Sequence, residues 1–232
     1  MEETGNYLRL MGTLSEAPVY GHEVFGEKFF YATLSVPRLS GAEDLLPITL
    51  SERLMEGNAL SAGSPLAIEG QLRSYNKVIE GAGRLLITAF AQRLLPPEEE
   101  ENPNQVQLTG ALCKMPSYRT TPFGREIADL MLAVNRAYGK SDYSPCITWG
   151  RTARFASHLN VGDKVQLLGR FQSRAYQKQL ADGSVVGKMA YEVSVGRLTM
   201  AHEGMMGMPL SARDMLDEHG MGDMQHMAST PQ

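Results

Sequence analysis

The segment NQVQLTGALCKMPSYR, residues 104–119, repeats the pattern of an earlier segment, NYLRLMGTLSEAPVYG, residues 6–21. Further matches follow in the same order along the chain, and both copies close on Arg-Leu. Matches this widely spread in a constant order indicate an internal duplication. The clearest are at a constant offset of 98 residues, where Gly12, Leu14, Pro18 and Tyr20 correspond to Gly110, Leu112, Pro116 and Tyr118.

Within each copy, short apolar or alternating runs are bounded by Gly, Pro and Asp, which is typical of β-strands. Only RTARFASHLN, residues 151–160, has helical spacing. Five strands with one short helix between the third and the fourth describe an OB-fold, and glycines at 110, 150 and 169 suit the bends and close approaches of a small barrel. We therefore predict an all-β protein with two tandem five-stranded OB-fold barrels, each with one short helix, and a flexible C-terminal tail.

Composition divides the chain into four parts. Residues 5–95 form the predicted N-terminal OB-fold, a degenerate copy, and residues 104–200 form the predicted C-terminal OB-fold. The acidic, proline-rich residues 96–103 between them predict an extended linker, because prolines remove backbone donors and the glutamates repel each other. Residues 201–232 are rich in Met and Gly and predict a flexible tail.

Charge is segregated along the chain, although the whole protein of 232 residues has a net charge of only −4. Residues 104–200 hold 13 Lys and Arg against 6 Asp and Glu, a net charge of +7. The segments 1–95, 96–103 and 201–232 are negative, at −3, −4 and −4. A basic module with acidic flanks is typical of a protein that binds a polyanion.

Several functional classes find no support. No run of 18 apolar residues exists, so we expect no membrane span, and the N-terminal MEETGNYLRL has no apolar core of a secretion signal. Cys113 and Cys146 are in no metal spacing, which favours free thiols in a reducing cytosol over a disulfide. Three tail histidines match no ligand scheme, and no nucleophile elbow or dinucleotide fingerprint occurs. We predict no enzymatic activity, no metal and no cofactor.

One hairpin has an unusual surface. GRFQSRAYQKQLADGSVVGKMAYEVSV, residues 169–195, reads as two strands joined at Ala-Asp-Gly. Strand alternation places Arg170, Gln172, Arg174 and Tyr176 on one face. A single nucleic-acid strand exposes bases that stack on aromatic rings and phosphates that attract cations. The hairpin therefore predicts an arm that contacts single-stranded nucleic acid.

The second copy resembles the bacterial single-stranded DNA-binding protein family over residues 104–198. The most specific matching pieces are HLNVGDKVQLLGRFQSRAYQ and DGSVVGKMAYEVSV, supported by LAVNRAY and WGRTARFA. For Trp149 alone, packing in the barrel core and base stacking stay equally open. The resemblance implies base stacking by Tyr138, Tyr143, Trp149 and Tyr176, phosphate contacts by Arg119, Arg136, Arg170 and Arg174, and weaker contacts by Lys178 and Lys188.

The first copy matches the family less well. Where the second copy has Tyr138, Tyr143 and Tyr176, the first has Ser40, Leu45 and Lys77. We expect this copy to be mainly structural, completing an oligomer, with at most a secondary contact to DNA.

The function predicted from these features is sequence-independent binding and protection of single-stranded DNA in replication, recombination or repair, in the bacterial cytoplasm at the nucleoid. The family commonly presents four barrels per assembly, so two barrels per chain predict a homodimer. Replication or repair proteins are expected as further partners, although the tail ends in HMASTPQ and lacks the family's acidic tip ending in phenylalanine. Two alternatives stay open: a primosome-like OB-fold scaffold with incidental DNA binding, and an oligosaccharide-binding barrel.

Overall fold

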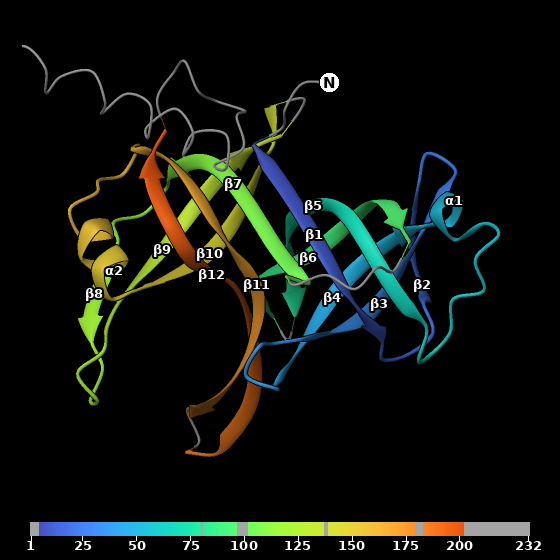
Figure 1. The fold of residues 1–232 in the computed structure, drawn as a ribbon, viewed down its shortest axis with the longest axis horizontal. Coiled ribbons are helices and arrows are strands. Elements are labelled where there is room, and N and C mark those ends of the chain that lie inside the picture. The colour runs from blue at the N-terminus through green and yellow to red at the C-terminus, as the bar shows by residue number, and fades with distance from the viewer. Residues whose placement is uncertain (1–4, 80, 97–101, 137–138, 180–182, 202–232) are drawn as a thin grey trace, which may run out of the picture.

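A computed structural model describes residues 5–79, 81–96, 102–136, 139–179 and 183–201. In these residues the chain forms twelve strands and two short helices, so the all-β prediction is confirmed (Figure 1). Most of the predicted linker, residues 97–101, and the predicted tail from residue 202 onward lie outside the described residues.

The two copies contain the same elements in the same order (Figure 1). The first copy consists of β1 (Asn6–Leu14), β2 (Val19–Val24), β3 (Glu27–Pro37), β4 (Glu43–Ser51), α1 (Glu52–Met55), β5 (Pro65–Ile79) and β6 (Ala82–Leu95). The second consists of β7 (Asn104–Leu112), β8 (Ser117–Thr120), β9 (Glu126–Asn135), β10 (Ser141–Trp149), α2 (Gly150–Ala156), β11 (Lys164–Gln179) and β12 (Val185–Met200).

Five strands of each copy pair in a closed ring. The rings run β1-β5-β6-β4-β3-β1 and β7-β11-β12-β10-β9-β7. The single helix lies between the third and fourth of these strands in each copy, which is the predicted OB-fold connectivity. The short strands β2 and β8 are additional, because each pairs only with the strand that follows it. Helix α2 ends at Ala156, four residues before the helical spacing of the sequence ends.

The barrel interiors are filled by aliphatic side chains from alternate strand positions, with Phe171 fully buried in the second copy. Close packing explains two of the predicted glycines. A Cβ at Gly169 would lie 2.3 Å from the carbonyl oxygen of Ser194, and one at Gly110 would lie 2.3 Å from that of Ala133. The register of β11 against β12 shifts between Leu168 and Gly169, which bends the strand as a barrel requires. Gly150, the third predicted glycine, has a φ of +52°.

The two barrels share one sheet. Strand β1 pairs antiparallel with β7, with Leu8 opposite Val106, so the twelve strands form a continuous hydrogen-bonded sheet. The two strands lie side by side at the centre of the molecule, with α2 and α1 on opposite sides of them (Figure 1). The last residue of the predicted linker also contacts this sheet, because the Met11 amide donates to the Pro103 carbonyl at 2.8 Å.

Each copy extends its longest hairpin beyond the barrel. We call β5–β6 the first arm and β11–β12 the second arm, which projects from the lower edge of the molecule in Figure 1. Strand β5 contacts β10 of the other copy, and β11 contacts β4. Each arm is therefore held partly by the opposite barrel.

Candidate nucleic-acid interface

Three of the four predicted stacking residues lie on the outer surface of the second copy. In β10, Ser144, Cys146 and Thr148 are buried, so alternation turns Tyr143 and Trp149 outward, and each is 42% exposed. Tyr176 on β11 is 38% exposed. The fourth residue, Tyr138, lies outside the described residues.

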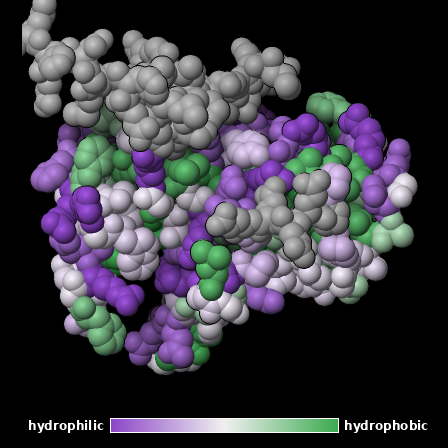
Figure 2. Space-filling model, in the orientation of Figure 1, coloured by the Kyte–Doolittle hydropathy of each residue, from purple (hydrophilic) through white to green (hydrophobic). Residues whose placement is uncertain are grey.

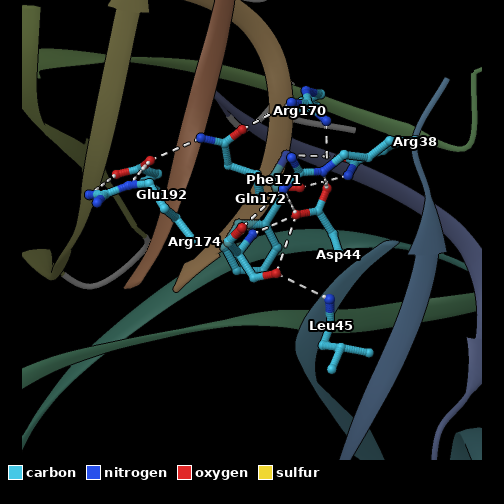
Figure 3. A network of polar contacts seen from close by, with 10 residues as sticks. Arg38, Asp44, Leu45, Arg170, Phe171, Gln172, Arg174 and Glu192 are labelled. Carbon is cyan, nitrogen blue, oxygen red and sulfur yellow. Dashed lines mark hydrogen bonds and ion pairs between the residues drawn. The ribbon is translucent and has the colours of Figure 1, made fainter. Parts of the chain in front are cut away.

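Tyr176 is accompanied by a cation on its own strand. The Arg174 guanidinium lies 5.9 Å from the centroid of the Tyr176 ring, within the range of a cation–π contact. Its Nε also donates to Glu192 on the neighbouring strand at 3.2 Å (Figure 3). Glu192 in turn accepts from the buried amide of Gln172 at 2.9 Å. Gln172 is thus an internal member of the predicted polar row, and Arg174 and Tyr176 are its surface members.

Arg170, at the base of the second arm, faces the other copy. Its Nη1 lies 3.5 Å from the carboxylate of Asp44, and its Nη2 donates to Gln172 at 3.0 Å (Figure 3). Asp44 is fully buried, so it needs the charged and polar donors around it. The predicted phosphate-binding residue therefore also compensates a buried carboxylate.

Asp44 is the centre of a polar network that joins the first barrel to the second arm (Figure 3). It accepts from Arg38 Nε at 2.7 Å and from the Ser173 amide at 2.7 Å, and the Ser173 hydroxyl accepts from the Leu45 amide at 3.2 Å. Arg38 Nη2 donates to the Ser173 carbonyl at 3.0 Å. The hydrogen bond to Asp44 raises the pKa of Arg38.

The same network occurs a second time with the copies exchanged. Buried Asp142 accepts from Arg136 Nε at 2.9 Å and from the Ser74 amide on the first arm at 2.6 Å. The Tyr143 amide donates to the Ser74 hydroxyl at 2.7 Å. Arg73 Nη1 lies 3.8 Å from Asp142, and burial together with the nearby Arg136 lowers the pKa of Arg73. We call the Arg38–Asp44–Ser173 and Arg136–Asp142–Ser74 groups the two clamps.

The remaining predicted cations differ in their surroundings. Arg119 on β8 forms an exposed ion pair with Asp129 on β9. Lys188 on β12 is partly exposed and lies directly opposite Tyr176 in the strand register, while the surroundings of the Lys178 side chain lie outside the described part.

A notch separates the tips of two projecting hairpins of the second copy. Figure 2 shows it between the β8–β9 hairpin and the second arm, with hydrophobic atoms at the tip of the first. Phe123, in the β8–β9 turn, is 92% exposed. An exposed ring such as Phe123 offers a flat face on which a base of a single strand can stack.

Sequence reasoning missed the acidic partners of these arginines. Asp129, Asp142 and Glu192 neutralise Arg119, Arg136 and Arg174 locally, so the net charge of +7 is not all available to an anion. One signal was available, because Asp44 and Asp142 follow the same offset of 98 residues as Arg38 and Arg136. A pair of charges preserved through a duplication of this kind indicates a shared structural role.

Other kinds of site find no support in the described part of the chain. No group of three or more His, Cys, Asp and Glu side chains there is placed to hold a metal ion. No described helix is long and apolar enough to cross a membrane. Burial raises the pKa of Cys146, which makes its thiol unreactive.

The fold and the surface define a tandem OB-fold protein with an aromatic and cationic outer face on its second copy. The model of the family described as "Single-strand binding protein family" matches residues 103–201. Single-stranded DNA-binding protein B of Bacillus subtilis is 37% identical over 83 residues, which are 33% of this chain and 74% of that protein. Single-stranded DNA-binding protein 1 of Staphylococcus aureus is 39% identical over 83 residues, 33% of this chain and 50% of that protein.

Solved structures resemble a larger part of the chain. A deletion mutant of the single-stranded DNA binding protein from Thermus aquaticus aligns with a TM-score of 0.64 and 25% identity, over 88% of this chain and 97% of that one. The wild-type protein gives the same TM-score over 86% and 94%. The chain belongs to the single-strand binding protein family. It spans about half the length of several of the curated relatives it matches.

Proposed function

We propose that this protein binds single-stranded DNA without sequence preference and protects it during replication, recombination or repair. The proposed role is non-enzymatic. Bases stack on Tyr138, Tyr143, Trp149 and Tyr176, and phosphates contact Arg119, Arg170, Arg174, Lys178 and Lys188. Arg136 acts mainly through its clamp, because its guanidinium is engaged by buried Asp142.

The observation that carries the proposal is the exposure of Tyr143, Trp149 and Tyr176 on one copy. The exposed part of each ring gains nothing from packing within the chain, whereas each base stacked on such a ring contributes about 1–3 kcal/mol. Arg174, in contact with Tyr176, supplies the positive charge that such a site needs next to a phosphate.

The test is a titration of the full chain with poly-dT. Trp149 is the only tryptophan, so its fluorescence reports directly on the proposed site. We expect quenching on binding, little difference between base compositions, and a log–log salt slope of about −0.7 for each phosphate neutralised. Tyr176→Ala should weaken binding by about 1–3 kcal/mol, and Arg174→Ala should make the slope less steep by about 0.7.

Tyr176→Phe is the matched control, because it keeps the ring and removes only the hydroxyl. It should bind like the unaltered protein. Full affinity in Tyr176→Ala and Arg174→Ala would place the DNA elsewhere on the chain. Failure of the unaltered protein to bind poly-dT would favour the alternative, an OB-fold scaffold for other proteins.

The proposal includes a homodimer with four OB-folds. It is supported by a row of side chains across the central strands, where Tyr7 and Leu168 both lie opposite Gln107 in the register. Both are partly exposed and offer apolar area to a second copy. Light scattering should give twice the mass of one chain, and a strict monomer would contradict this part of the proposal.

The proposed location is the bacterial cytoplasm, at the nucleoid, with replication or repair proteins as further partners. The support is indirect: the relatives are bacterial proteins named for single-stranded DNA binding, and single-stranded DNA arises at the chromosome. Imaging of a fluorescent fusion during DNA damage should show foci on the nucleoid. A uniform distribution would argue against it.

A further inference from the structure

A cavity of about 930 Å³ lies between the two copies, and both of them line it. The second copy contributes Tyr176 and Lys188 from its arm, while the first copy contributes Tyr31 from β3, Tyr75 from β5 and Arg84 from β6. Tyr176 belongs to the proposed DNA site. The cavity therefore connects that site with three aromatic or cationic residues of the first copy.

The two arms carry the same pair of residue types in reversed order. Ser74 and Ser173 occupy equivalent places, since each donates its amide to the buried aspartate of a clamp. Counting from them, Tyr75 corresponds to Arg174 and Lys77 corresponds to Tyr176. Residues two apart on a strand share a face. Each arm therefore presents one ring and one cation on the same face. An alignment of the two copies hides this similarity, because it places Lys77 of the first arm opposite Tyr176 of the second.

The first-copy rings are accessible and held in place. Tyr75 is 42% exposed, and burial of the remainder together with the neighbouring Tyr31 raises its pKa. The Tyr31 hydroxyl is 3.0 Å from Nδ1 of His22, and His22 stacks on Phe29 with centroids 5.1 Å apart. A ring with a fixed orientation loses little freedom when a base stacks on it.

The charge around the cavity suits a polyanion although the first copy is acidic as a whole. Among the described residues that line it, Glu192 is the only acid, and Arg174 and Gln172 bind its carboxylate. Several acidic residues of the first copy are paired elsewhere, namely Glu27 with Arg53, Glu52 with Lys28 and Glu69 with Arg93. The net charge of −3 for residues 1–95 therefore does not describe the surface that faces the second arm.

We propose that Tyr31 and Tyr75, with Arg84, form a second base-stacking site, so that one DNA strand bound at Tyr176 crosses the cavity onto the first copy. This inference rests on the proposed function. It assigns the first copy a direct role in binding, beyond its structural role in the clamps. The ligand is the single strand itself, continued by the nucleotides next to those stacked on Tyr176.

The experiment compares oligo-dT of increasing length on the full chain. For oligomers long enough to reach both copies, Tyr75→Ala should weaken binding about five- to a hundred-fold. The shortest oligomers that bind at Tyr143 and Tyr176 should bind Tyr75→Ala and the unaltered protein equally. Arg84→Gln should make the salt slope for the long oligomers less steep by about 0.7. Tyr75→Phe keeps the ring and should bind normally, as should Tyr20→Ala, which removes an exposed tyrosine of the same copy outside the cavity.

The outcomes separate this inference from the proposed function. If Tyr176→Ala weakens binding and Tyr75→Ala leaves it unchanged at every length, the function stands and the second site is rejected. If the unaltered protein binds no oligo-dT, both fail together. Photocrosslinking of iodouracil-substituted oligomers to the unaltered protein needs no folded variant. Adducts on Tyr75 or Tyr31 support the crossing, and adducts confined to the second copy overturn it.

Discussion

The hydroxyl of Tyr7, on the central strand β1, ionises only at a higher pH than a free tyrosine does. Burial, followed by the hydrogen bond that its hydroxyl donates to Glu69 at 3.0 Å and the charge of that carboxylate, raises the pKa of Tyr7 to about 12. An anionic phenolate beside a carboxylate is unfavourable, so folding favours the neutral form.

We expect Tyr7 to ionise near pH 12 in the folded protein. Because its pKa is raised on folding, its contribution to stability is complete below about pH 10 and is lost as the pH rises through about 12. The measurement is the difference in ultraviolet absorbance at alkaline pH between the protein and Tyr7→Phe. A difference titration centred near pH 10 would show that this environment does not act on Tyr7.

Single residues also mark the limit of what the sequence could predict. The sequence left Trp149 open between the barrel core and the surface, and the structure turns it outward on β10 together with Tyr143. Strand alternation did not reveal that Gln172 is buried or that Arg170 faces Asp44 of the other copy. Arg170 and Asp44 are more than a hundred positions apart, and Gln172 meets Glu192 on the neighbouring strand. No local pattern records which carboxylate of another strand a polar side chain will meet.

At the scale of strands, the bend of β11 depends on one glycine. A Cβ at Gly169 would lie 2.3 Å from the Ser194 carbonyl oxygen, which belongs to the backbone and has little room to move. Gly169→Ala should destabilise the protein by about 1–3 kcal/mol through overpacking. Gly187→Ala is the matched control on the paired strand, since its Cβ would meet nothing within 4 Å, and it should change stability by less than about 0.5 kcal/mol. Equal unfolding midpoints in urea for the two variants would refute the close-approach argument.

The clamps hold strands of one copy to strands of the other. Asp142 is buried, and its removal would leave Arg136 without its carboxylate and the Ser74 amide without an acceptor. Asp142→Ala should therefore cost about 3–5 kcal/mol, as is usual when one partner of a buried pair is deleted.

The neighbouring pair of Asp129 and Arg119 provides the comparison. Both side chains are exposed, so Asp129→Ala should change stability by no more than about 1 kcal/mol. Denaturant unfolding of the two variants measures the contrast. A loss in Asp142→Ala as small as that in Asp129→Ala would mean that the clamp contributes little to the joining of the copies.

At the scale of the whole molecule, the duplicated sequence predicted the two barrels but not how they pack against each other within the chain. The repeat predicted two barrels, and closed rings of five strands are present in both. It did not indicate that β1 and β7 would pair with each other. A strand edge can pair with any other edge, and only the three-dimensional arrangement decides which one it meets. The reciprocal clamps are equally non-local, since each joins an arm to a barrel on the other side of that pairing.

These joins make the two copies one cooperative unit. Neither barrel can unfold alone without exposing the paired edge of β1 or β7 and leaving a buried aspartate without its donors. We expect calorimetry of the full chain to show one unfolding transition. Its calorimetric and van't Hoff enthalpies should be equal when both copies are counted as a single folding unit. Replacing both Asp44 and Asp142 by alanine should weaken the contacts between the copies and separate their melting, whereas Asp129→Ala should leave a single transition.

Two transitions in the unaltered protein would show that the barrels are independent. The first copy would then be unable to hold the second arm in the position that the proposed DNA path requires.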